Sequence, residues 1–213
     1  MSSEKTEVNA IVLSSMPVGE SDRRLVLLSR ELGKITVFSR GARSPKSALL
    51  AASQPFAFGV FTILPGKSAY SLVKAEISHY FRELTEDLML LSYGTYFLEF
   101  AAYFSEENMD GTEELSLLFY SLKALLSDAF DNRLVRRIFE MKTFVIDGAY
   151  PEVDRLQLSE TARYTLSFII SSPLRQLYSF EVTEEALQEI EKVLDRYIRA
   201  NIPREFKSLK LLA

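Results

Sequence analysis

The feature that most constrains the fold is a change in hydrophobic periodicity near residue 82. Between Val8 and about Tyr80, apolar and polar residues alternate in short runs separated by Gly, Pro and Ser. Alternation with a period of two is typical of strands that bury one face, whereas recurrence every three or four residues indicates a helix. The first part of the chain therefore predicts five short strands, at residues 8–13, 23–30, 34–40, 56–64 and 70–77.

These strands and their turns predict a small closed or sandwiched β-fold. Turn residues follow the first strand at Pro17-Val18-Gly19, the second at Leu32-Gly33 and the fourth at Pro65-Gly66-Lys67, as expected where the chain reverses. Residues 41–53 form a longer connection, and five-stranded oligonucleotide-binding (OB) barrels often place a helix or extended loop between their third and fourth strands. We therefore expect an OB-fold barrel within residues 1–82.

Beyond residue 82 the pattern becomes helical. The segment from Leu88 to Phe104 is apolar nearly all round, which predicts a helix at the centre of a bundle. Its aromatic residues could be read as a platform for base stacking, but core packing is the better interpretation of rings at helical spacing. Further helices are expected at 114–130, 133–147, 159–171 and 184–201. The fold class is thus α+β, with an all-helical second domain over residues 83–213.

Charge is divided unequally between these two parts. The whole chain has a net charge of −4. Residues 1–82 carry 11 Lys or Arg and 6 Asp or Glu, a net of +5, while residues 83–213 carry 14 and 23, a net of −9. A basic part joined to an acidic part indicates contact with nucleic acid, although chance segregation of charge would look the same.

The basic residues of the expected barrel suggest a nucleic-acid surface. On the third strand, alternation places two cations and an aromatic ring on one face, and Ile35 and Val37 on the other. On the fifth strand Tyr70 and Lys74 share one parity. Proteins that bind single strands without sequence preference place cations along the phosphate backbone and aromatic rings where the bases can stack on them. Phe38 could equally face the core. The candidate DNA-binding residues are Arg23, Arg24, Lys34, Phe38, Arg40, Arg43, Lys46, Tyr70 and Lys74.

A search for catalytic or metal-binding residues finds little. His79 is the only histidine, and there is no cysteine, so neither a thiolate metal site nor a disulfide can form. The chain contains no Gly-x-x-x-x-Gly-Lys-Ser/Thr phosphate loop and no Gly-x-Gly-x-x-Gly turn. We expect a binding protein that has no enzymatic activity and no cofactor.

One helical segment, residues 133–144, could bind a partner. Arg133, Arg136 and Arg137 are three and four residues apart, hence on one side of a helix, with Phe139 and Met141 close by. A cationic rim beside apolar groups suits a peptide that ends in acidic residues, a bulky side chain and a carboxylate. The alternative is that the arginines pair with the domain's own carboxylates.

Several sequence blocks resemble the RecO family of bacterial recombination mediators. The N-terminal block runs from Gly19 to Ser47, and it is followed in the family's order by Gln54-Pro55-Phe56, Ala75-Glu76, Tyr96-Phe97-Leu98-Glu99, Arg137-Ile138-Phe139-Glu140-Met141-Lys142, Gly148-Ala149-Tyr150-Pro151 and Arg204-Glu205-Phe206-Lys207-Ser208. Together the blocks span nearly the whole chain. No single block is decisive, whereas the ordered set is specific.

This resemblance implies an N-terminal OB barrel, a C-terminal helical domain and a role in DNA repair. RecO proteins bind single- and double-stranded DNA, anneal complementary strands, associate with RecR, and help load RecA onto DNA covered by single-strand-binding protein. Some of them engage the acidic C-terminal tail of that protein through the helical domain, which makes the Arg133–Phe144 segment the candidate tail site. The resemblance also implies a cytoplasmic, nucleoid-associated protein. In agreement, the N-terminus lacks the pattern of a signal peptide, and no apolar run approaches the ~20 residues of a membrane span.

The chain departs from the family pattern in one place. Many members carry a four-cysteine zinc module after the Gly-x-x-Pro block, whereas residues 152–158 here lead directly into a helix without cysteine. We therefore expect the zinc module to be absent. Two other classes stay open: a protein-interaction scaffold with weak, salt-insensitive DNA binding, and a small enzyme that would need a pocket with convergent polar groups.

Overall fold

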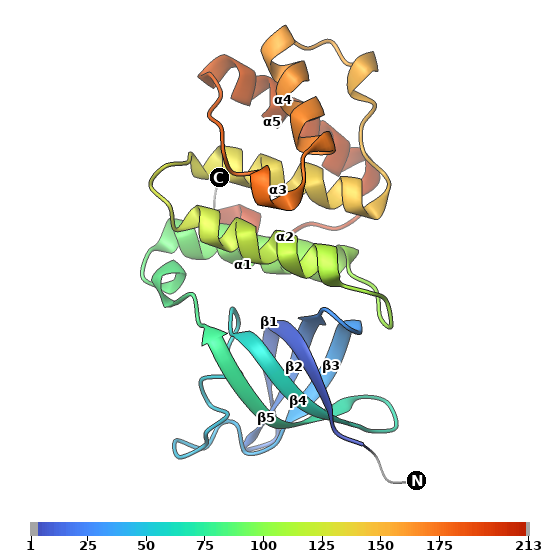
Figure 1. Cartoon of the computed structure of the whole chain (residues 1–213). Coiled ribbons are helices and arrows are strands. Elements are labelled where there is room, and N and C mark those ends of the chain that lie inside the picture. The colour runs from blue at the N-terminus through green and yellow to red at the C-terminus, as the bar shows by residue number, and fades with distance from the viewer. Residues whose placement is uncertain (1–3, 212–213) are drawn as a thin grey trace. The chain divides into compact units, whose positions relative to one another are not determined.

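A computed structural model describes residues 4–211 of the chain, and its first part is a closed barrel (Figure 1). The strands follow one another around the barrel in the order β1-β2-β3-β5-β4, with β4 pairing β1 to close it. All pairs are antiparallel except β3 with β5. The strands are β1 Thr6–Val18, β2 Asp22–Ser29, β3 Gly33–Ser39, β4 Phe58–Pro65 and β5 Tyr70–His79. This confirms the predicted five-stranded OB-type barrel.

The barrel core follows the predicted period of two. Inward positions of every strand meet in one apolar cluster, whose members include Val8, Leu25, Ile35, Phe61 and Leu72. The connection from β3 to β4 contains neither a helix nor a strand and consists of consecutive turns. Gly59 on β4 lies so close to β5 that a Cβ atom there would meet the Glu76 carbonyl oxygen at 2.1 Å.

Residues 98–115 belong to the same compact unit as the barrel. The turn between β2 and β3 is hydrogen-bonded to them: the Lys34 amide donates to the Glu106 carbonyl at 2.8 Å, and the Asn108 amide donates to the Leu32 carbonyl at 3.0 Å. Gly33 and Gly111 allow this close approach, because a Cβ on either would lie 2.3 Å from a backbone oxygen. The sequence patterns did not predict this attachment.

The remainder of the chain is helical, as expected. Short 3-10 turns lie at Arg82–Thr85, Val153–Arg155, Leu174–Gln176 and Lys207–Leu211, and the five α-helices are α1 Leu88–Phe104, α2 Thr112–Leu125, α3 Asn132–Asp147, α4 Glu160–Ser171 and α5 Glu184–Asn201. Helix ends follow capping chemistry. The Asp131 side chain accepts a bond from the Arg133 amide at the start of α3, and Gly148 ends that helix in the left-handed region, at φ +83°.

Contacts divide the chain into two units, each compact by itself. One comprises Met1–Arg82 and Leu98–Leu115, and the other comprises Glu83–Phe97 and Ser116–Ala213. Helix α1 therefore contributes to both. The assignment of DNA binding to residues 1–82 and of partner binding to residues 83–213 stays a prediction.

Candidate nucleic-acid interface

The outer surface of the barrel presents one row of side chains that crosses three strands. Arg24 on β2 is opposite Met16 on β1 and opposite Phe38 on β3. Paired positions place their side chains about 5 Å apart on the same face of a sheet. Ile35 and Val37 point into the core, so Phe38 is turned outward and is half-buried, while Arg24 is exposed. A cation, an aromatic ring and a thioether thus adjoin on the outer face.

The basic connection after β3 begins at the same end of these strands. Arg40, Arg43 and Lys46 are all exposed. The Gly41 amide donates to Asp22 Oδ1 at 2.8 Å, and the Arg43 amide donates to the Ser21 carbonyl at 2.8 Å. These bonds hold the start of the connection against the turn between β1 and β2. The segment is therefore a set of hydrogen-bonded turns.

Two of the predicted cations are engaged inside the unit. Lys34 Nζ donates to the Ala102 carbonyl at 2.8 Å, near the C-terminal end of α1, where cations stabilise a helix. Arg23 has the same parity as Leu25 and Leu27, the inward residues of β2, and its Nη1 donates to Ser15 Oγ at 3.0 Å. Its Nε is buried without a hydrogen-bond partner among the residues that the structure describes. Both side chains are half-buried, whereas Arg43 is exposed although its Nη1 donates to the Gly19 carbonyl at 3.0 Å.

The expectation that Tyr70 and Lys74 share a face of β5 is wrong. The pairing of β5 with β4 passes from Thr62–Lys74 to Ile63–Leu72, so Val73 is an extra residue at a β-bulge. A bulge reverses the alternation on either side of it. Tyr70 accordingly packs against the barrel core, while Lys74 is exposed and forms an ion pair with Glu76. The sequence carries no glycine at this point to signal the bulge.

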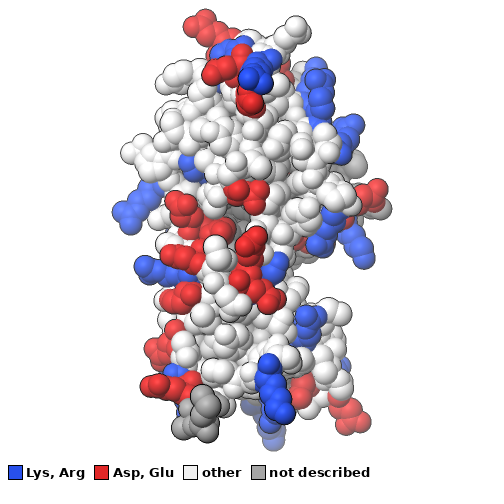
Figure 2. Space-filling model, turned by 90° about the vertical axis from the view of Figure 1, so that its right-hand side faces the viewer, with Lys and Arg blue, Asp and Glu red and all other residues white. Residues whose placement is uncertain are grey.

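The structure therefore brings Arg24, Phe38 and Arg40 together and places Arg43 and Lys46 on the adjoining turns. We call these five residues the barrel surface. Figure 2 shows one face of the molecule, on which Lys and Arg side chains are interspersed with Asp and Glu.

The predicted partner segment lies within α3, where its arginines form ion pairs. Arg133 contacts Glu184 at 3.0 Å and Glu191 at 2.7 Å on α5. Arg136 and Arg137 each lie 2.8 Å from Glu140. Phe139 and Met141 are buried in the core. The arginines thus pair with the domain's own carboxylates, as the alternative interpretation predicts.

Glu140 is the centre of this network and was missed by sequence reasoning. It is fully buried and also accepts a hydrogen bond of 2.6 Å from the Tyr96 hydroxyl. Burial by itself would raise the pKa of Glu140, but the guanidinium groups of Arg137 and Arg136 outweigh this effect and lower it. Burial also raises the pKa of Tyr96 well above its ordinary value. The available signal was the spacing of Arg136 and Arg137, four and three residues before a glutamate.

The single histidine lies beside a serine hydroxyl and an aromatic ring. His79 is exposed, its Nδ1 lies 3.1 Å from Ser78 Oγ, and its ring stacks on Phe81 at 5.8 Å. Within residues 4–211 there is no group of three or more His, Cys, Asp or Glu side chains that could hold a metal ion. No helix in that range is both long and apolar enough to cross a membrane.

Comparison with known proteins covers nearly the whole chain. Residues 1–81 match the family model described as Recombination protein O N terminal, and residues 85–156 and 147–210 match Recombination protein O C terminal. A DNA repair protein RecO from Acetivibrio thermocellus is 26% identical over 97% of this chain and 95% of its own length. Relatives with the same name are 34% identical in Alkaliphilus metalliredigens, over 70% of this chain and 60% of the relative, and 27% identical in Listeria welshimeri, over 98% and 93%.

Proposed function

Because this chain belongs to the RecO family of DNA repair proteins, we propose that it is a DNA-binding recombination mediator whose barrel surface holds the DNA backbone. In this proposal the protein binds single- and double-stranded DNA and promotes the annealing of complementary strands. Together with RecR it loads RecA onto DNA that is covered by single-strand-binding protein. In this role the protein binds DNA and protein partners and breaks no covalent bond.

The observation that carries this proposal is the barrel surface. Four exposed cations, Arg24, Arg40, Arg43 and Lys46, accompany one outward aromatic ring, Phe38. Cations bind phosphates and release counterions, whereas a ring stacks on any base. This combination favours a single strand held without sequence readout, and the cations alone can hold a duplex backbone.

The partners of this proposal are DNA, RecR and the C-terminal tail of single-strand-binding protein, with RecA reached indirectly. Of the three arginines predicted to bind the tail, Arg133 has the most exposed side chain. Its exposed fraction is 36%, against 15% for Arg136 and 4% for Arg137. We therefore propose that a tail contact on α3 involves Arg133, with carboxylates of the tail replacing Glu184 and Glu191 as its partners. The proposed place of action is the cytoplasm, at the nucleoid.

The first test is a salt titration of DNA binding. Fluorescence anisotropy of a labelled single strand is measured for the wild type and for the triple variant Arg40→Ala, Arg43→Ala, Lys46→Ala. We expect log affinity to fall with log salt at a slope of about −0.7 per phosphate neutralised, and the slope to be about two units shallower in the variant.

The matched control removes three exposed cations from the helical elements: Lys123→Ala, Arg155→Ala, Arg175→Ala. Its net charge equals that of the barrel variant, so any general charge effect appears in both. A control slope equal to that of the barrel variant would refute a localised barrel surface. Absence of binding by the wild type at low salt would instead favour a scaffold that acts only through protein partners.

A further inference from the structure

The C-terminal part of the helical domain has the opposite charge from the rest of that domain. Residues 83–191 contain 8 Lys or Arg and 21 Asp or Glu, a net of −13, whereas residues 192–213 contain 6 and 2, a net of +4. The reversal occurs within α5, between Glu191 and Lys192. The negative net charge of the whole domain therefore does not reveal this basic segment.

Three of these cations form one line along α5. Lys192, Arg196 and Arg199 are separated by four and three residues, so they share a helix face, and all three are exposed. We call them the α5 stripe. Together with Asp195 and Ala200 they line a hollow of about 490 Å³. Among the described residues none of the three forms a salt bridge, while the Asp195 carboxylate is bound by Arg137 at 2.8 Å.

Helix stability accounts for Arg199 but not for the other two cations of the stripe. Like charges three or four residues apart repel each other and destabilise a helix. The helix dipole favours cations only within the last turn, which includes Arg199 but neither Lys192 nor Arg196, since α5 ends at Asn201. A line of cations that costs helix stability and has no ion-pair partner among the described residues is typical of a surface that binds a polyanion.

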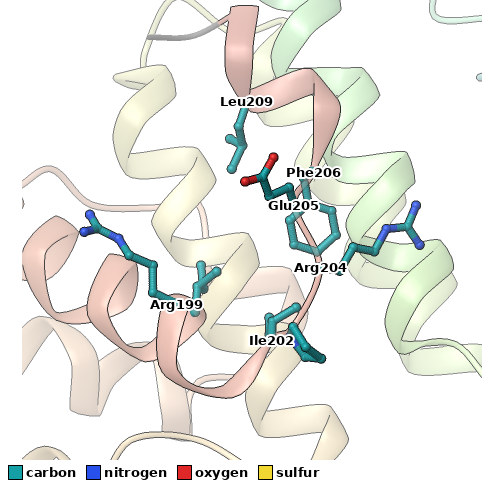
Figure 3. A pocket seen from close by; sticks show the side chains of 8 residues that line it. Arg199, Ile202, Arg204, Glu205, Phe206 and Leu209 are labelled. Carbon is teal, nitrogen blue, oxygen red and sulfur yellow. The ribbon is translucent and has the colours of Figure 1, made fainter.

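An apolar cavity of about 520 Å³ lies beside the stripe, and its geometry helps to identify the polyanion. Figure 3 shows the guanidinium groups of Arg199 and Arg204 pointing away from the cavity, while the Glu205 carboxylate lies on the cavity side near Leu209. An acidic peptide anchored in the cavity would meet this carboxylate instead of the two cations. The stripe by itself therefore suits a ligand whose negative charges repeat along a backbone.

We propose that the α5 stripe binds the phosphates of a second nucleic-acid strand. The stripe spans about 10 Å at 1.5 Å per residue, which is about three nucleotide rises of 3.4 Å along one strand. This inference rests on the proposed function, in which the barrel surface holds the first strand. One chain that carries two strands at once raises the chance that complementary sequences meet, which is what annealing requires.

The test compares four proteins: the wild type, the variant Lys192→Ala, Arg196→Ala, Arg199→Ala, the Lys123, Arg155 and Arg175 control variant, and the conservative variant Lys192→Arg, Arg196→Lys, Arg199→Lys. Sedimentation at low salt counts the labelled oligonucleotides of about 12 nucleotides bound per chain, a length within one OB-fold site. Fluorescence energy transfer measures the annealing rate of two complementary strands. Alanine removes the like-charge repulsion, so thermal unfolding of the stripe variant is expected at or above the wild-type temperature.

We expect two oligonucleotides per chain for the wild type, the control and the conservative variant, and one for the alanine variant, with annealing slowed at least tenfold. A stripe variant that still binds two strands and anneals at the control rate would overturn the proposal. So would a wild type whose α5 stripe binds a poly-glutamate peptide but no second oligonucleotide, which would indicate a protein partner. A barrel surface that does not bind DNA would be recognised separately. In that case the salt slope of the Arg40, Arg43 and Lys46 variant would equal that of the wild type.

Discussion

Gly33 lies where β3 begins, in a conformation and at a distance that only glycine fits. Its φ is +62°, and a Cβ atom would lie 2.3 Å from the Glu106 carbonyl oxygen. We expect Gly33→Ala to combine the strain of a left-handed alanine with a backbone clash and to lower the free energy of unfolding by about 2–3 kcal/mol. Urea unfolding followed by circular dichroism measures this loss.

The control is Gly19→Ala, because Gly19 has a similar φ of +55° but nothing within 4 Å of a Cβ. It should cost about 1 kcal/mol, the conformational part alone. Equal losses at the two positions would show that the attachment of residues 106–111 does not constrain Gly33.

At the scale of one element, α3 depends on a buried carboxylate. Glu140 accepts bonds from Tyr96, Arg136 and Arg137. We expect Glu140→Gln to destabilise the protein by about 3–5 kcal/mol at pH 7, since removal of this buried charge leaves Arg136 and Arg137 with only Asp195 and Glu191 as carboxylate partners. The folded-state pKa of Glu140 is lowered. Its stabilisation is therefore complete above the unfolded-state pKa, about 4.3, and is lost as the pH falls through the folded-state pKa.

Chemical denaturation between pH 3 and pH 7 measures this dependence. Glu181→Gln, on an exposed residue outside any helix, serves as the control and should change stability by less than about 0.5 kcal/mol. The Glu140→Gln variant should lose less stability on acidification than the wild type. An equal loss in both would mean that Glu140 does not contribute to the acid sensitivity.

At the scale of the whole molecule, α1 is one helix shared by two units. Residues 88–97 belong to the unit of the helical domain and residues 98–104 to the unit of the barrel. We expect Glu99→Pro, which removes a helix hydrogen bond, to cost about 3 kcal/mol and to weaken both units. Hydrogen exchange would then quicken in the amides of β3 and also in those of α3.

Glu99→Ala is the matched control, since it shortens the same side chain and leaves the helix intact. Its exchange rates measure the loss of the side chain alone, and those of the proline variant should exceed them in both β3 and α3. If proline accelerates exchange in one unit only, the two units unfold independently and the shared helix does not couple them.

Sequence patterns predicted one part of the candidate DNA-binding site correctly and another part wrongly. Parity along β3 correctly separated Phe38 from Ile35 and Val37, because alternation is a local property of a strand. The same reasoning failed on β5, where the bulge at Val73 separates Tyr70 from Lys74. A bulge depends on the strand that pairs alongside, so it cannot be read from the run of residues that contains it.

The sequence by itself determined the order and type of the elements, the closed barrel followed by helices, and the division of charge between them. These follow from periodicity, turn residues and composition, which act over a few neighbouring residues. Only the tertiary structure decided which charges are free. Lys34 is engaged at the end of α1 and Arg137 is buried against Glu140, whereas Arg24 and Arg196 stay exposed. Whether a cation is available to a ligand depends on partners distant in the sequence, and only the folded chain brings those partners together.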